Sequence, residues 1–346
     1  MRTDLFDFDL PQELIAQTPT DRGVSRLLVV SRANGPLEHR SFRDLLNYLG
    51  PGDTLVLNDT RVSARRLKAL RPGGHEAEVL LLRPVGERSW EALVKPGKAL
   101  KPGKSLTILE AGSTEQTVSA VVLETTAAGG RILEFTDRRT RDNLASSGTI
   151  PLPPYIDTVL PHEQEERYQT VYGVNGGSAA APTAGLHFST EILAAIRELD
   201  VALAYVTLHV GIGTFRPVRT EEIEDHEMHA ESFTISPETA DIINATRGRV
   251  IAVGTTSVRV LEAVAAPSSG GRSLVRAHTG NTNLFITPGY KFKVVDGMIT
   301  NFHLPRSTLL MLVSAMAGQE NILRAYKAAV EEQYRFFSFG DAMLIL

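Results

Sequence analysis

The sequence predicts an α/β fold, in which a layered α/β/α domain carries an inserted small all-β barrel domain. Two observations point to this fold. Up to residue 60 and again after residue 150, strand-like apolar runs alternate with segments of helical spacing, as in a sheet with helices on its faces. Between residues 61 and 150, short apolar runs recur between Pro-Gly and Gly-Gly turns, which is typical of small barrels. We therefore expect a discontinuous larger domain, residues 1–60 and 151–346, and a barrel over residues 61–150.

Spacing and capping residues locate the individual elements. Ser189 and Ser236 are suited to begin helices, because a serine hydroxyl can accept a hydrogen bond from a free first-turn amide. In the larger domain the pattern predicts helices over 41–49, 189–199, 236–246, 255–264, 307–317 and 322–334, and strands over 54–58, 201–208, 249–253 and 284–287. In the barrel it predicts strands over 78–82, 90–94, 106–109, 118–123 and 131–135.

The absence of cysteine from the 346 residues restricts the chemistry. It excludes disulfides, thiolate nucleophiles and cysteine-ligated metal sites. The N-terminus carries acids where a signal peptide has a basic start, and the longest apolar run, residues 309–317, is too short to cross a bilayer. We expect a soluble, cytoplasmic, monomeric protein with no membrane partner.

Positive charge is concentrated in the predicted barrel. The chain has a net charge of −4, but residues 61–150 hold 15 Lys and Arg against 10 Asp and Glu, so this part carries +5 and the rest −9. Residues 61–71 and 95–104 each contain several cations and no acid. The asymmetry favours a polyanionic partner for the barrel, although a solvated charged surface would give the same pattern.

Four segments combine histidines with small or polar residues. One of them, a glycine-rich stretch, directly follows a predicted strand, and the carboxyl ends of strands are where α/β sheets bind ligands. We therefore predict a ligand pocket formed by these segments. They are residues 179–188 (AAAPTAGLHF), 207–218 (TLHVGIGTFRPV), 226–231 (HEMHAE) and 301–308 (NFHLPRST).

Other kinds of site fit these patterns less well. A dinucleotide-binding fingerprint could begin at Gly211, but Arg216 stands where its third glycine belongs. A metal site could use His226 and His229 with neighbouring acids, but these histidines are three residues apart, whereas helical zinc motifs use four. The segment 254–259 (GTTSVR) begins a predicted helix and could hold an anion, or its threonines could simply cap that helix.

Longer motifs identify a family. The chain closely resembles the S-adenosylmethionine:tRNA ribosyltransferase-isomerases of queuosine biosynthesis, with motifs in family order along essentially its whole length. Departures are small: Ser63 stands where the family usually has an additional Ile-Pro, and residues 174–178 (VNGGS) are looser than usual. The matching motifs are FDFDLPQELIAQTP near the start, LVLNDTRV at 55–62, AAPTAGLHF at 180–188, LHVGIGTFRPV at 208–218, HEMHAE at 226–231, VGTTSVRVLE at 253–262, the run 284–315 and RFFSFGDAMLI at 335–345.

The resemblance implies an enzyme that uses S-adenosylmethionine as co-substrate and needs no metal. Such an enzyme transfers and isomerises the ribosyl moiety onto 7-aminomethyl-7-deazaguanine at the tRNA wobble position, which gives epoxyqueuosine, adenine and methionine. Residues 1–60 and 151–346 would then form the catalytic domain, and the basic barrel would face the tRNA. The residues expected to hold tRNA phosphates are Arg61, Arg65, Arg66, Lys95, Lys98 and Lys101.

This reaction requires proton transfer near neutral pH. The acceptor amine must lose a proton before it attacks, and the expelled adenine must gain one, so histidine is the suitable side chain. We expect catalytic roles for His187, His209, His229 and His303. Phe188, Phe215 or Phe302 could stack on a base, Arg259 could pair with the methionine carboxylate, and Asp225 and Glu231 could hold an imidazole or the ammonium group. The predicted cofactor-binding residues are Thr183, Gly185, Phe188, Gly211, Gly213, Thr214, Asp225, Glu231, Thr255, Thr256, Ser257 and Arg259.

Three rival functions stay open on the residues alone. An S-adenosylmethionine-dependent RNA methyltransferase would release S-adenosylhomocysteine instead of adenine. A metal-dependent hydrolase built on His226 and His229 would lose activity to a chelator. A non-catalytic RNA-binding protein would use the basic insert without turning over any cofactor.

Overall fold

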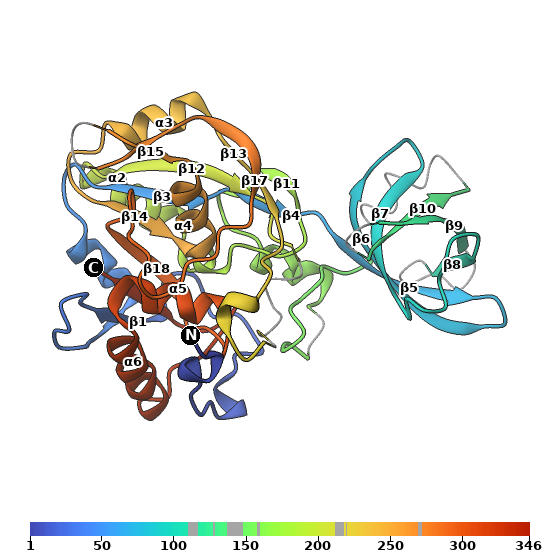
Figure 1. The fold of residues 1–346 in the computed structure, drawn as a ribbon, viewed down its shortest axis with the longest axis horizontal. Helices are drawn as coiled ribbons and strands as arrows, with labels where there is room; N and C mark the ends of the chain where they lie inside the picture. Colours follow the sequence, from blue (N-terminus) through green and yellow to red (C-terminus); the bar gives the residue numbers. More distant parts are fainter. Residues whose placement is uncertain are drawn as a thin grey trace.

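The chain forms two bodies, a large sheet-based body and a small barrel beside it, joined by a narrow connection (Figure 1). The computed structural model describes residues 1–109, 117–126, 129–136, 148–157, 160–211, 218, 220–268 and 272–346. Both termini lie on the large body. The predicted fold class, a layered α/β domain with a small all-β barrel, is confirmed.

The large body is built on a nine-stranded mixed sheet. Its central strands β12, β3, β14 and β18 are parallel, while β19, from the C-terminus, inserts antiparallel to β18 and parallel to β1. In spatial order the strands are β17 (His278–Thr282), β13 (Glu231–Ile235), β12 (Ala202–Leu208), β3 (Thr54–Asn58), β14 (Val250–Val253), β18 (Gly297–Asn301), β19 (Ala342–Ile345), β1 (Arg26–Val30) and β2 (Glu38–Ser41).

Helices cover both faces of this sheet. Because successive strand residues point to opposite faces, Val56 of β3 joins one apolar cluster while Leu55 and Leu57 join the other. The first cluster contains side chains of α3 (Pro237–Asn244), α4 (Gly254–Ala263), α5 (Thr308–Ala317) and α6 (Gln319–Glu331). The second contains side chains of α2 (Thr190–Glu198) and of the 3-10 helix η3 (Phe42–Tyr48).

The small body is a closed antiparallel barrel with strand order β10-β7-β6-β5-β8-β9. Leu67, Trp90 and Leu133 are among the side chains that fill its interior. The boundaries proposed at residues 61 and 150 stay a prediction. The strands are β5 (Arg65–Arg71), β6 (His75–Pro84), β7 (Ser89–Lys95), β8 (Ser105–Leu109), β9 (Thr117–Thr125) and β10 (Arg131–Phe135).

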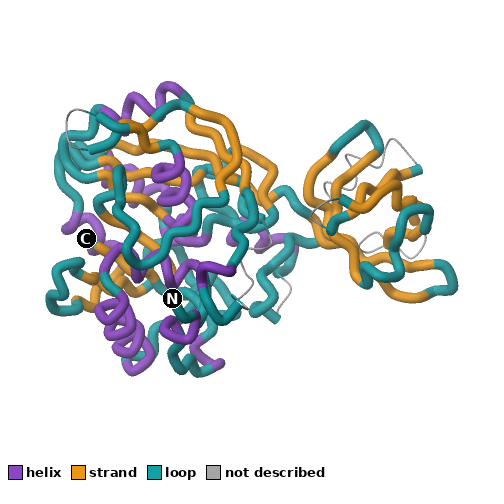
Figure 2. The backbone as a smooth tube through the Cα atoms, viewed as in Figure 1, coloured by secondary structure: helices purple, strands orange, loops and turns teal. Residues whose placement is uncertain are grey.

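The connection between the two bodies is a small parallel pairing. Strand β4 (Thr60–Val62), on the way into the barrel, pairs with β11 (Asn175–Ser178). Figure 2 shows strand and loop segments, and no helix among the described residues, crossing between the bodies. Arg65, at the barrel entrance, forms an ion pair with Glu165 at 2.6 Å, and both side chains are largely buried.

The capping predictions hold, but one predicted strand is wrong. Ser189 and Ser236 accept hydrogen bonds from first-turn amides of α2 and α3. Residues 284–287 form no strand; the strand is β17, a few residues earlier. The backbone of Leu284 is instead satisfied by side chains, since its N–H donates to Thr282 Oγ1 and its carbonyl accepts from Arg259 Nε. Among the described residues, every helix falls short of the length and apolar character that a bilayer span requires.

Candidate active site

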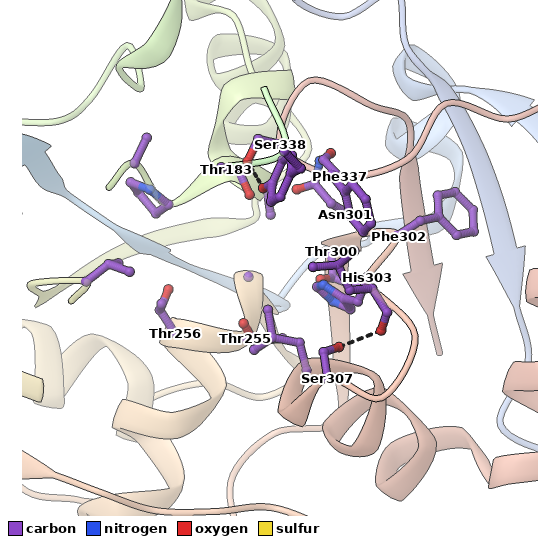
Figure 3. A pocket seen from close by; sticks show the side chains of 18 residues that line it. Thr183, Thr255, Thr256, Thr300, Asn301, Phe302, His303, Ser307, Phe337 and Ser338 are labelled. Atoms are coloured by element: carbon purple, nitrogen blue, oxygen red, sulfur yellow. Dashed lines mark hydrogen bonds between the residues drawn. The ribbon is translucent and has the colours of Figure 1, made fainter. Parts of the chain in front are cut away.

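A cavity opens at the carboxyl ends of β14 and β18. Because these strands are parallel neighbours, the residues that follow them meet at one edge of the sheet, where α/β proteins bind ligands. The cavity holds about 720 Å³ of empty space, a figure that includes open solvent at its mouth. Figure 3 shows the lining side chains, with labelled residues from the segments 183, 255–256, 300–307 and 337–338 around the cavity. The polar and aromatic lining residues are Tyr155, Thr183, Thr255, Thr256, Thr300, Asn301, Phe302, His303, Ser307, Phe337 and Ser338.

Helix α4 begins directly at the cavity. Gly254 has φ +83°, a conformation that glycine adopts without penalty, and this lets β14 turn straight into the helix. No side chain caps this helix, so the alternative in which a threonine acts as its cap is wrong. Thr256 Oγ1 instead accepts a hydrogen bond from Asn58 Nδ2 at 3.2 Å. The hydroxyl of Ser257 is committed to the carbonyl of Val253 at 2.7 Å, on the buried side of the helix.

His303 is the predicted catalytic histidine that lines the cavity. Its Nε2 lies 2.8 Å from Thr300 Oγ1, and its backbone N–H donates to the hydroxyl of Tyr326. Burial lowers the pKa of His303 to about 3, so the imidazole is neutral at pH 7. Its Nδ1 has no hydrogen-bond partner within the described ranges, which leaves this atom for a ligand.

His187 lies behind the cavity wall. Its Nδ1 is 2.8 Å from Ser25 Oγ and its Nε2 is 3.2 Å from Asn301 Nδ2, while the ring stacks on Phe42. Asn301 also donates to the carbonyl of Phe337, which fixes its amide nitrogen on that side. Burial, aided by the charge of Arg22, lowers the pKa of His187 to about 4. His187 therefore orients Asn301 and borders a smaller second cavity on its other side.

The other two predicted histidines lie elsewhere. His209 is half-buried near the connection to the barrel, where its Nδ1 is 2.8 Å from Thr60 Oγ1 and its ring covers Gly177. Burial lowers the pKa of His209. His229 is exposed, as is Asp225. Neither His209 nor His229 lines the cavity described above, and the catalytic roles predicted for them stay predictions.

Arg259 and Glu231 form a buried ion pair, with both side chains only 5% exposed. Glu231 also accepts from the backbone N–H of Gly211 at 2.8 Å. Arg259 donates further to the carbonyls of Leu284 and Thr282. These contacts are all internal to the protein, and a role of the pair in binding cofactor stays a prediction.

The remaining predicted residues divide between the cavity and the core. Thr183 lines the cavity and Phe188 is fully buried in the second apolar cluster, while Phe302 lines the cavity and is also fully buried in the first cluster. Gly185 is needed for packing, because a Cβ there would lie 2.1 Å from Tyr172 Oη. The residues Gly213, Thr214 and Phe215 lie outside the described ranges.

Several lining residues were not among the predicted site residues. Tyr155 and Ser338 come from distant parts of the chain, and their hydroxyls lie 2.6 Å apart at the cavity. Phe337 and Ser338 belong to the quoted motif RFFSFGDAMLI, and Asn301 stands two residues before His303 in NFHLPRST. Those two motifs were the sequence signal from which these lining residues could have been predicted. In the described part of the chain there is no group of three His, Cys, Asp or Glu side chains that could hold a metal.

The six predicted tRNA-binding residues also fall into two groups. Arg61 contacts Glu166, Arg65 is paired with Glu165, and Arg66 lies 3.6 Å from Glu78. The other three, Lys95, Lys98 and Lys101, are exposed and make no ion pair with the described residues.

Comparison with known proteins gives the family. The chain matches the family model described as "Queuosine biosynthesis protein" over residues 3–345. It is 51% identical to the S-adenosylmethionine:tRNA ribosyltransferase-isomerase of Heliobacterium modesticaldum and 53% identical to that of Symbiobacterium thermophilum, with 100% of both chains covered in each case. It is also similar to the crystal structure of S-adenosylmethionine tRNA ribosyltransferase from Thermotoga maritima, with 39% identity, a TM-score of 0.55, and 99% of this chain and 100% of that one covered. The chain belongs to the queuosine biosynthesis protein family.

Proposed function

We propose that this chain is an S-adenosylmethionine:tRNA ribosyltransferase-isomerase. It transfers and isomerises the ribosyl moiety of S-adenosylmethionine onto 7-aminomethyl-7-deazaguanine at the wobble position of tRNA, and it releases adenine and methionine. The observation that carries this proposal is the match to relatives of that name over the full length at about half identity. We propose further that the protein acts as a cytoplasmic monomer.

The cavity at β14 and β18 suits the adenosyl part of the co-substrate. No acid, lysine or arginine is among its described lining residues. A buried ammonium without a counter-charge is costly, whereas a neutral base needs only hydrogen bonds and apolar contacts. The hydroxyls of Thr183 and Ser338 and the amide of Asn301 can supply such bonds. We therefore assign the adenine and ribose to this cavity and the charged amino-acid end to its mouth.

His303 is our candidate for proton exchange with the expelled adenine. The sulfonium of the co-substrate acidifies the adjacent C5′ hydrogens, and loss of one of them begins the rearrangement that expels the base. The leaving adenine must then take up a proton. A neutral imidazole whose Nε2–H is donated to Thr300 Oγ1 has its Nδ1 lone pair free, so it can accept the C5′ proton at Nδ1 and return the same proton to a ring nitrogen of the leaving base. None of these steps requires a metal.

The barrel is our candidate for the tRNA contact. Residues 61–150 carry a net charge of +5, from 15 cations and 10 acids, while the rest of the chain is acidic. Lys95, Lys98 and Lys101 are exposed and unpaired toward the described residues, so they are free to neutralise phosphates. We assign residues 1–60 and 151–346 to the catalytic domain and residues 61–150 to the tRNA-facing one.

The test is a product analysis. The protein is incubated with S-adenosylmethionine and tRNA that carries the aminomethyl-deazaguanine, and adenine and methionine should appear in equal amounts. The variant His303→Asn should lower kcat by about a hundredfold or more, the usual contribution of a positioned proton-transfer group. His278→Asn, on the exposed face of edge strand β17, is the control and should keep full turnover. Release of S-adenosylhomocysteine instead of adenine would establish the rival methyltransferase reaction.

A further inference from the structure

One loop of the barrel carries four lysines and no acid. Its sequence, residues 95–104 (KPGKALKPGK), has a lysine at every third position. We call this segment the lysine loop. All four lysines are exposed, and none makes an ion pair with the described residues. Four like charges on one short loop repel one another, so something must hold the loop in place.

The loop is held from inside the barrel by Arg131. This residue of β10 is only 9% exposed. Its Nε donates to the carbonyl of Leu100 at 2.6 Å and its Nη2 to the carbonyl of Gly97 at 2.8 Å. Its Nη1 donates to the carbonyls of Gly129 and Gly130, both at 2.8 Å. Four of the five guanidinium N–H groups are therefore committed to backbone oxygens, two of which belong to the lysine loop.

Two other contacts complete the anchoring. The side chain of Leu100 is 1% exposed and belongs to the apolar interior of the barrel. At the end of the loop, Gly103 N donates to Val122 O at 2.8 Å and Val122 N donates to Lys104 O at 2.9 Å. The backbone between the lysines is thus fixed at its middle by Arg131 and Leu100, and at its end by β9.

We propose that the lysine loop is a preformed clamp for the phosphate backbone of folded RNA, and that Arg131 is its positioning residue. The inference rests on the proposed function, because it takes tRNA as the partner. Arg131 is buried and faces carbonyls, so it touches no phosphate itself. A loop that is already ordered loses less conformational entropy when it binds, and a tighter complex results. Lysine in place of Arg131 would keep the charge but could not reach four carbonyls from one planar group.

The experiment measures binding of a folded tRNA transcript in the absence of S-adenosylmethionine, over a series of salt concentrations. Arg131→Lys should weaken binding about tenfold and leave the slope of log Kd against log salt unchanged, because every phosphate contact can still form. The triple variant Lys98→Gln, Lys101→Gln and Lys104→Gln should weaken binding and also lower that slope by about two to three, roughly 0.7–0.9 for each contact. The matched control, Lys291→Gln, Lys293→Gln and Lys327→Gln in the large body, should change neither.

Two further measurements separate positioning from collapse of the barrel. Trp90 is the single tryptophan of the chain and lies in the barrel interior, so its emission reports whether the barrel is folded. With that emission unchanged, Arg131→Lys should still speed tryptic cleavage after Lys98. If Arg131→Lys unfolds the barrel, Leu100→Ala takes its place, since it removes the other central anchor and leaves all cations intact.

The outcomes are distinct. Unchanged tRNA affinity in a folded anchor variant, or an unchanged salt slope in the lysine triple variant, would overturn the clamp. Because binding is measured without turnover, the clamp can fail while adenine release still occurs. Failure of adenine release with salt-dependent tRNA binding intact would count against the proposed reaction alone.

Discussion

The buried pair of Glu231 and Arg259 provides a sharp test of which predicted site residues serve the ligand and which serve the fold. In Glu231→Gln, the single amide oxygen must replace two carboxylate oxygens, one facing Arg259 Nη1 and the other facing Gly211 N. Whichever way the amide is turned, its NH2 group meets a donor. The guanidinium also keeps its charge without a counter-charge, at a site where both side chains are 5% exposed. Breaking such a pair costs about 3–5 kcal/mol.

The assay is urea unfolding followed by far-ultraviolet circular dichroism, together with KM for S-adenosylmethionine. We expect Glu231→Gln to lower the free energy of unfolding by at least about 3 kcal/mol, and to leave KM within about twofold under conditions where the variant is folded. The double variant Glu231→Gln with Arg259→Met should recover part of the loss, because no isolated charge stays buried. A loss below about 1 kcal/mol, accompanied by a large rise in KM, would refute this reasoning and place Arg259 on the methionine carboxylate.

The remaining predictions concern buried histidines and a close backbone approach. Burial holds the pKa of His187 at about 4 and that of His303 at about 3, below their ordinary value, so only the unfolded chain binds these protons between pH 6.5 and 4. The free energy of unfolding should therefore be highest above pH 6.5 and fall by up to about 1.4 kcal/mol per pH unit for each histidine as the pH drops. Urea titrations at pH 7 and pH 5 measure this fall. If the difference in unfolding free energy between the two pH values were the same in His187→Asn as in the unmodified protein, the prediction would be contradicted. Gly185→Ala would place a Cβ 2.1 Å from Tyr172 Oη and should cost about 1–3 kcal/mol of stability, measured beside Gly50→Ala, which meets nothing within 4 Å.

Five of the six barrel strands and strands β3, β12 and β14 of the larger sheet could be predicted, because turn residues and apolar runs mark them in the sequence, whereas the other six strands of that sheet were not predicted. Strand β5, the one barrel strand missing from the prediction, also shows a strand pattern in its sequence. Its inward residues Leu67 and Ala69 alternate with exposed Arg66 and Lys68, a period of two that the density of cations obscures. The strand wrongly predicted at residues 284–287 is the reverse case, in which an apolar run in the sequence forms no strand. Ile286 is buried, at 1% exposure, and Leu284 and Phe285 are partly buried, but the backbone of Leu284 is satisfied by the side chains of Thr282 and Arg259 rather than by a neighbouring strand.

The residues that line the cavity were harder to predict than the helices and strands, because they depend on which strands become neighbours in the sheet. His303 and Thr255 share a cavity since β14 and β18 are adjacent and parallel, although the end of β14 at Val253 and the start of β18 at Gly297 are 44 positions apart in the sequence. Ser338 joins them because the last strand of the chain, β19, is inserted beside β18. His209 directly follows β12, and its neighbour Val210 reaches the cavity, but successive residues of an extended segment point to opposite sides, so the His209 ring faces Thr60 and the barrel connection instead. The place of a histidine relative to the cavity is thus set by strand order together with the direction of its side chain. If turnover proved as sensitive to His209→Asn as to His303→Asn, the adenosyl site would have to extend across β3 toward the barrel.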